Sequence, residues 1–318
     1  MRGSLCRLAV ALAGLLALPA ALAAQPRVQT LYAHVADASG APVTGLGPSD
    51  FQMSKDGAPQ RISRVIYSGS PKRILLLVDT SDALSSPVIN PLRQALATFV
   101  NSLPVDAEVV LATMGGQLHV RVEPTTDHQA LARGIAGIFT EGGDTVLMDA
   151  IVEGNTRFLV PAEARAPVIV VVATEGPDGS SMRDDKFPQF VNDMAGRGTV
   201  AYAVVLGLTA TQRDVRPTAG GNRRIDNAIL SNDTSGQTIV AMNITKATGG
   251  RYEQVNSATA VADKLKAFAA DMTADRKNMA GWYQIGFASE TVPHAVRVQV
   301  LQPDTKIQLS PVRPGSKN

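Results

Sequence analysis

Short side chains with oxygen donors gather in three segments of the sequence. They are residues 79–83 (Asp-Thr-Ser-Asp-Ala), 141–145 (Glu-Gly-Gly-Asp-Thr) and 174–178 (Thr-Glu-Gly-Pro-Asp). None of the three contains His or Cys. Carboxylate and hydroxyl oxygens without nitrogen or sulfur donors suit a hard divalent cation such as Mg²⁺. If the fold brings the segments together, they predict a cation site or a polar recognition site.

The sequence gives no support for a histidine metal site, a catalytic triad or a dinucleotide-binding site. The four histidines are scattered, at His34, His119, His128 and His294, and none has a spacing typical of a metal site or a catalytic triad. No Gly-x-Ser-x-Gly motif is present, and Asp-Thr-Ser follows the first apolar strand where a dinucleotide-binding fold needs glycines. Because no nucleophile–base pair can be named, the sequence predicts that the protein is not an enzyme.

The elements that must position the three segments alternate between strand and helix. Apolar runs of strand length occur at 74–78, 108–114, 118–122, 168–173, 200–206 and 251–255, and helical spacing of apolar residues at 90–103, 128–139, 146–159, 184–197, 238–247 and 258–278. This alternation predicts an α/β fold with a doubly wound, mostly parallel sheet covered on both faces. Ligands of such sheets lie beyond the carboxyl ends of the strands, where two of the segments begin.

Two flanking regions have the shorter, alternating pattern of β structure. Residues 28–67 contain two such runs with turns at Ser39-Gly40 and Asp56-Gly57, and strands are expected again at 282–287, 295–301 and 306–309. We therefore expect an N-terminal β module (25–70), a central domain (71–279) and a C-terminal β extension (280–318) that packs beside the first module. Residues 208–236 lack periodicity and are expected to form a long exposed loop.

The first 24 residues are typical of a secretory signal peptide. Arg2 and Arg7 come before an apolar run over residues 8–22. Ala21-Leu22-Ala23 then supplies the small-x-small pattern of a cleavage site. The alternative is a retained anchor, but the run is shorter than the roughly 20 residues of a spanning helix. We expect export to the periplasm or the extracellular space, and removal of Cys6, the only cysteine, so that the processed chain has no disulfide.

The charge balance argues against two classes of partner. The formal net charge of +2 falls to zero when Arg2 and Arg7 are removed, since no acidic residue precedes Asp37. A neutral chain has no electrostatic attraction to nucleic acid or to anionic lipid. The processed chain is therefore expected to bind neither nucleic acid nor the membrane in a stable way, and its partner is expected to be a protein.

Several motifs in order carry a resemblance to a known family. An apolar strand ending in Asp-x-Ser, a Gly-Gly-x-Thr before a helix and a third strand ending in an acidic residue and Gly resemble the adhesion-site loops of von Willebrand factor type A domains. Bacterial VWFA-related proteins resemble the chain further in their leader and C-terminal segments. The matching segments here are 45–62, 247–252 (Ala-Thr-Gly-Gly-Arg-Tyr), 283–287 and 297–300.

The resemblance implies a metal-ion-dependent adhesion site that is incomplete here. Asp79 and Ser81 would be the ligands from the first loop and Thr145 the ligand from the second, with Glu175 at the third-loop position. Ala83 stands where a second serine belongs, and Glu175 is one methylene longer than the usual aspartate. Mg²⁺ requires near-ideal octahedral geometry. We expect no required cofactor and weak Mg²⁺ binding at most; alternatively, Asp79 and Thr145 only hold loops and helix N-termini together.

The function implied by the resemblance is recognition of a partner protein at the top of the sheet. The residues expected to take part are Asp79, Ser81, Thr145 and Glu175. The alternative is a structural scaffold or assembly subunit of the cell envelope that uses the β modules and needs no metal. An open cleft around these residues would favour recognition, and a site plugged by neighbouring side chains would favour the alternative.

Overall fold

A computed structural model describes residues 27–84, 86–162, 165–182, 185–207, 236–289 and 295–311. The expected signal peptide (1–24), with Cys6, lies outside the described residues. So do residues 208–235 of the expected loop, and His294.

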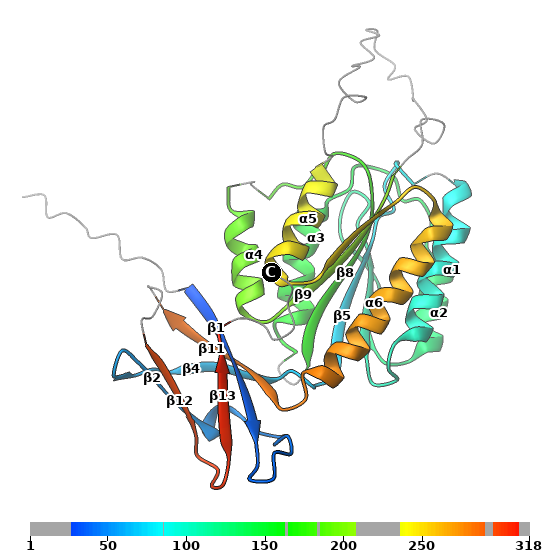
Figure 1. The fold of residues 1–318 in the computed structure, drawn as a ribbon. Coiled ribbons are helices and arrows are strands. Elements are labelled where there is room, and N and C mark those ends of the chain that lie inside the picture. Colours follow the sequence, from blue (N-terminus) through cyan, green and yellow to red (C-terminus); the bar gives the residue numbers. More distant parts are fainter. Residues whose placement is uncertain are drawn as a thin grey trace, which may run out of the picture.

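The central domain is built on a six-stranded sheet, and the predicted fold class is confirmed. The strand order is β10-β9-β8-β5-β6-β7 (Figure 1). All neighbouring strands are parallel except β6 and β7, which form an antiparallel pair at one edge. β8 and β9 are buried along their whole length, which explains their near-continuous runs of Val, Ile and Ala. The strands are β5 (Lys72–Val78), β6 (Glu108–Thr113), β7 (His119–Thr125), β8 (Ala166–Thr174), β9 (Val200–Leu206) and β10 (Arg251–Val255).

Helices cover both faces of this sheet. On one face lie α1 (Ser86–Ser102), α2 (His128–Ala136) and α6 (Ala258–Asn278), and on the other α3 (Leu147–Gly154), α4 (Phe187–Gly196) and α5 (Gly236–Thr248). Two of the predicted helices differ in detail from the structure. The helix predicted for residues 146–159 changes after Gly154 into a π-helical turn, Asn155–Leu159. The helix predicted for residues 128–139 is α2, which ends three residues earlier, at Ala136.

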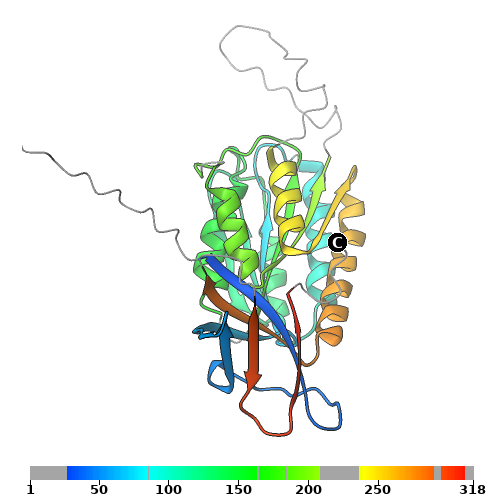
Figure 2. The same ribbon diagram turned by 60° about the vertical axis from the view of Figure 1, so that its left-hand side comes forward.

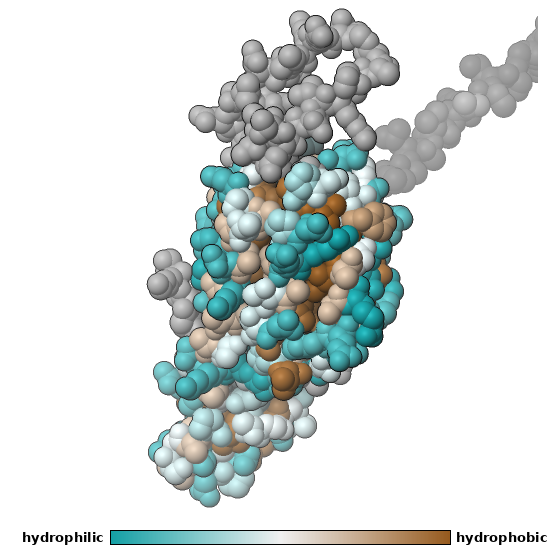
Figure 3. All heavy atoms as spheres, turned by 90° about the vertical axis from the view of Figure 1, so that its right-hand side faces the viewer, coloured by the Kyte–Doolittle hydropathy of each residue, from teal (hydrophilic) through white to brown (hydrophobic). Residues whose placement is uncertain are grey.

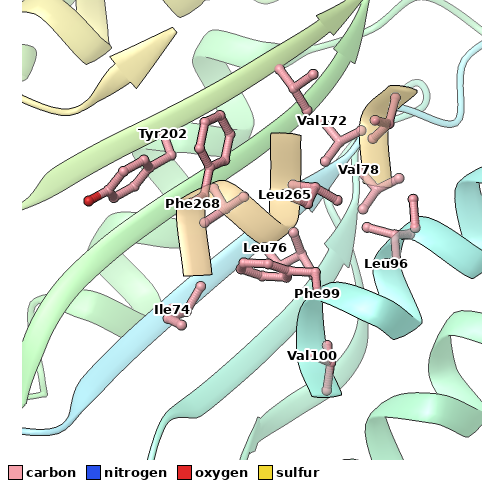
Figure 4. Close-up of a cluster of buried hydrophobic side chains, with 14 of the residues drawn as sticks. Ile74, Leu76, Val78, Leu96, Phe99, Val100, Val172, Tyr202, Leu265 and Phe268 are labelled. Atoms are coloured by element: carbon pink, nitrogen blue, oxygen red, sulfur yellow. The ribbon is translucent and has the colours of Figure 1, made fainter. Parts of the chain in front are cut away.

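The core on the α1 and α6 side shows how the apolar spacing is used. Ile74, Leu76 and Val78 alternate along β5 and point toward α1 and α6, while Leu75 and Leu77 point to the opposite core. Figure 4 shows Phe99 of α1 and Phe268 of α6 reaching into this layer from two helices. Both rings are fully buried. Packing of this kind stabilises the domain without any disulfide.

The two flanking regions form one module instead of two separate ones. A four-stranded sheet, β13-β1-β11-β4, faces a three-stranded sheet, β12-β2-β3, across a small apolar core (Figures 1 and 2). Strand β11 lies between β1 and β4, so the C-terminal region completes the N-terminal sheet. The strands are β1 (Arg27–Ala36), β2 (Phe51–Lys55), β3 (Ala58–Pro59), β4 (Ile62–Tyr67), β11 (Trp282–Ser289), β12 (Val296–Val300) and β13 (Lys306–Ser310).

Polar contacts hold the sandwich against the central domain. The guanidinium of Arg64 in β4 donates to the main-chain carbonyl of Arg197, just after α4, at 3.1 Å, and the hydroxyl of Thr30 in β1 donates to the main-chain carbonyl of Gly196 in α4. The face that carries α1, α2 and α6 is largely hydrophilic, with separate hydrophobic patches (Figure 3). Over the parts of the chain that the structure describes, no helix has the length and apolar character needed to cross a membrane.

Candidate functional site

The three oxygen-rich segments meet at the carboxyl edge of the sheet. β5 and β8 are parallel neighbours with Val78 opposite Val172, so the residues that follow them emerge side by side. The second segment joins them because Thr145 forms a bridge with Gly115, just after β6. The structure therefore brings Asp79, Ser81 and Thr145 together, as the sequence predicts.

Asp79 is the centre of this arrangement. Its side chain is buried, with 1% of the residue exposed. One carboxylate oxygen accepts hydrogen bonds from the Ser81 amide (2.9 Å) and the Thr145 hydroxyl (2.8 Å). The other accepts from both the amide (3.2 Å) and the hydroxyl of Thr174. Four donors from three loops thus converge on a single carboxylate.

The site is plugged and has no open cleft at these residues. Ser81 and Thr145 are each 2% exposed, and Thr174 is buried to the same degree. The Ser81 hydroxyl oxygen accepts the amide of Ala83 at 3.3 Å, which closes the first loop on itself. A partner protein that docks on this conformation meets the edges of the loops and cannot reach the Asp79 carboxylate.

Glu175 lies apart from this cluster. Its carboxylate accepts a hydrogen bond from Gln254 of β10. Burial, together with the nearby Glu175 charge, raises the pKa of Tyr252 on the same strand. The longer side chain at the third-loop position therefore reaches the edge strand.

These residues do not fit a coordinated Mg²⁺. One carboxylate is available, and both its oxygens already accept hydrogen bonds. Ala83 supplies no oxygen, and Glu175 is directed toward β10. Within the described parts of the chain, no group of three or more His, Cys, Asp or Glu side chains could hold a metal ion. The arrangement is chemically a hydrogen-bonded pin between loops.

Thr174 is the member of this pin that the sequence reasoning did not identify. It is the last residue of β8 and the first residue of the third oxygen-rich segment, 174–178. Its hydroxyl and amide supply two of the four bonds to Asp79. The available signal was a hydroxyl residue at the carboxyl end of β8, the parallel neighbour of the strand that Asp79 follows.

A second carboxylate, Asp178, holds the third loop to the start of α3. It accepts the amides of Leu147 (2.8 Å) and Met148 (3.3 Å), which have no partner within their own helix. Asp149 of α3 in turn accepts the amides of Ser181 (2.7 Å) and Met182 (2.9 Å). Asp149 lies in the first turn of α3, where the helix dipole favours an acidic side chain, and it also fixes this loop.

A third carboxylate ties the second loop to the edge strand β7. Glu141 accepts the hydroxyl of Thr80 at 2.5 Å and pairs with Arg121. Its side chain is 9% exposed. Asp79, Asp178 and Glu141 therefore fix the three loops against each other. The exposed residues left at their rim are Asp82, Gly143, Asp144 and Pro177.

The strand order, the helical layers and the loops at the carboxyl edge define an α/β domain of the von Willebrand factor type A class. Residues 74–179 match the family model of the von Willebrand factor type A domain. Domains of this family are in general protein-interaction modules. No curated protein sequence matches the chain.

Solved structures add a likeness in fold. A von Willebrand factor type A protein from Catenulispora acidiphila has a TM-score of 0.50 at 10% identity, with 91% of this chain and 70% of that chain covered. BatB from Bacteroides thetaiotaomicron has a TM-score of 0.47 at 15% identity, covering 64% of this chain and 99% of its own. An aerotolerance-related membrane protein from Bacteroides fragilis has a TM-score of 0.46 at 16% identity, covering 63% and 99%.

Replacement of Asp178 by alanine is expected to lower the free energy of unfolding by about 1 kcal/mol, since α3 loses its cap. Burial raises the pKa of the Asp178 carboxyl. A raised folded-state pKa gives stability that is complete below the unfolded value, about 4, and is lost as the pH rises through the folded value. Urea unfolding should therefore show a larger difference between wild type and variant below pH 4 than at pH 7. An equal or smaller difference at low pH would contradict the role of burial.

Proposed function

We propose that the protein is an exported interaction module that recognises a partner protein, still unidentified, at the top of its central sheet. The observation that carries the proposal is the pinning of three loops by Asp79, Asp178 and Glu141 under an exposed rim. A rigid set of loops loses little conformational entropy on binding. Asp79, Ser81 and Thr145 hold the loops, and Glu175 with the rim residues Asp82 and Asp144 supplies the contacts.

Recognition in this proposal does not depend on Mg²⁺, because hydrogen bonds already satisfy the Asp79 carboxylate. The expected result is a melting temperature that differs by no more than about one or two degrees between Mg²⁺ and EDTA, since a weak site adds little stability at millimolar metal. The double variant Ala83→Ser, Glu175→Asp restores the missing donors and should respond more strongly to Mg²⁺. A large Mg²⁺ effect in the wild type, abolished by Asp79→Ala, would show that the native site binds the cation.

Export is the second part of the proposal and rests on the sequence of residues 1–24. The processed protein begins near Ala24 or Gln25 and is recovered from the periplasm or the medium. Mass spectrometry of protein purified from the native host tests this directly. An intact Met1 on cytoplasmic material would overturn it.

The alternative is a structural subunit of the cell envelope, and the burial of Asp79, Ser81 and Thr145 favours it. The two functions differ in the surface they use. Partner binding that is lost in Asp144→Arg and retained after substitution of exposed sandwich residues such as Gln299 supports recognition at the sheet top. The reverse pattern supports the scaffold.

A further inference from the structure

A groove lies between the β-sandwich and the opposite, amino-terminal end of the central domain. It has a volume of about 540 Å³. Its floor is the outer face of the four-stranded sheet, with Thr30, Gln284 and Gly286 on neighbouring strands. Its far wall is Val160 with the end of α4, at Gly196 and Arg197. The sheet-top loops contribute none of the described residues that line it.

One side of the groove is the edge strand β4. Four consecutive residues, Ser63 to Ile66, line it. Successive side chains of a strand point to opposite faces, so four in a row reach one groove only when the strand presents its edge. In the sheet order β4 is terminal, paired with β11 alone. The groove therefore runs along an edge of β4 that pairs with no second strand in the described structure.

The register shows which main-chain groups point into the groove. The Ser68 amide donates to the carbonyl of Trp282 at 2.8 Å, so Ser68 belongs to a hydrogen-bonded pair. Such pairs alternate along an antiparallel ladder. Ile66 and Arg64 therefore direct their main-chain groups to β11, while Val65 directs its N–H and C=O outward. A short extended segment laid beside β4 would find a donor and an acceptor at Val65.

The charge of the groove favours one kind of segment. Arg64 and Arg197 line it, and none of the described lining residues is acidic. Arg64 donates to the main-chain carbonyl of Arg197 at 3.1 Å, which holds the Arg64 guanidinium at this end of the groove. The hydrophobic wall at Val160, which is 40% exposed, suits the apolar side chains that alternate along an extended chain.

We propose that this groove binds an extended segment of a partner protein that adds as a strand to β4 and places an Asp or Glu side chain beside Arg64 and Arg197. The site is distinct from the sheet top and does not rest on the function proposed there. Binding of this kind combines main-chain hydrogen bonds, which give affinity, with side-chain pockets, which give specificity.

The test is selection of displayed random peptides of about ten residues on the purified protein. We expect selected peptides to carry an acidic residue within an alternating apolar pattern. Their affinity should fall at least about tenfold in Arg197→Glu, as loss of a charge pair of about 1.4 kcal/mol would give. It should be unchanged in the matched control Arg133→Glu, on the exposed face of α2. Because Arg64 donates its hydrogen bond to the main-chain carbonyl of Arg197, the substitution Arg197→Glu leaves that hydrogen bond in place.

Hydrogen exchange gives a second readout on the same complexes. A bound peptide should slow exchange in residues 62–67 and leave the loop at Asp79 unchanged. Selected peptides without acidic residues, equal affinity for Arg197→Glu, or protection at the sheet top would each overturn the proposal. Tighter peptide binding after removal of residues 312–318 would show that the chain's own tail is the occupant instead.

Discussion

Replacement of Asp79 by alanine is expected to lower the free energy of unfolding by about 4 kcal/mol. The change removes the acceptor of four hydrogen bonds and leaves buried donors on Ser81, Thr145 and Thr174 without a partner. Each unsatisfied buried polar group costs on the order of 1–3 kcal/mol, and water entering the loops recovers part of this cost. Urea unfolding followed by circular dichroism measures the difference.

Two variants sharpen this result. Asp144→Ala, on the exposed rim of the neighbouring loop, is the control and should change stability by no more than about 0.5 kcal/mol. Asp79→Asn keeps the size of the side chain but places an amide donor against the donors of Thr174. Its loss of unfolding free energy should therefore lie between those of Asp79→Ala and Asp144→Ala. If Asp79→Ala were as mild as Asp144→Ala, Asp79 would not pin the loops.

Replacement of Gly250 by alanine is the second change with a large expected effect. A Cβ atom at this position would lie 1.7 Å from the main-chain carbonyl oxygen of Ala201, in the central strand β9. This oxygen belongs to the main chain and cannot rotate away as a side chain could, so β10 must separate from β9. We therefore expect the free energy of unfolding to fall by at least about 3 kcal/mol.

The adjacent glycine supplies a matched control. Gly249 has a positive φ of 69° and no atom within 4 Å of an added Cβ. Alanine there should cost about 1 kcal/mol, from the left-handed conformation alone. Thermal melts of both variants test the close approach of the two strands. Equal losses at the two positions would show that steric contact with Ala201 is not the cause.

Much of the central domain could be predicted because its elements have strong local signals. The predicted limits of β9, β10 and α6 match the structure, since each combines an apolar pattern with a cap or a glycine turn. Asn155 to Leu159 looked like ordinary helix because a π-helical turn keeps the same apolar residues buried. Hydrophobic periodicity does not record which carbonyl accepts each amide.

The joining of the flanking regions could be predicted only in part. Short alternating runs at both ends of the sequence indicated strands, but pairing across more than 200 intervening residues depends on contacts that local sequence does not encode. Gln284 illustrates this, because it lies opposite Tyr32 in β1 and Ile66 in β4. The sequence therefore suggested two neighbouring modules where the structure has one.

The candidate site shows the same limit. Residue types and strand ends were enough to predict that Asp79, Ser81 and Thr145 meet. Side-chain direction was not predictable. Glu175 turns to Gln254, and Thr174 completes the contacts of Asp79, because positions in the loop after β8 are set by the tertiary contacts of Asp178 and Asp149. Whether the site is open or plugged depends on these contacts.

The central claim is that the rim of the sheet top binds a partner protein without Mg²⁺. The most direct measurement is photo-crosslinking in intact cells of the native host, with a photoreactive amino acid at Asp144 on the rim or at Val105, which is 84% exposed beyond the end of α1. We predict one crosslinked protein from position 144 and none from position 105, and the same product in envelope extracts that contain either Mg²⁺ or EDTA. No product at position 144, or a product that EDTA abolishes, would contradict the claim.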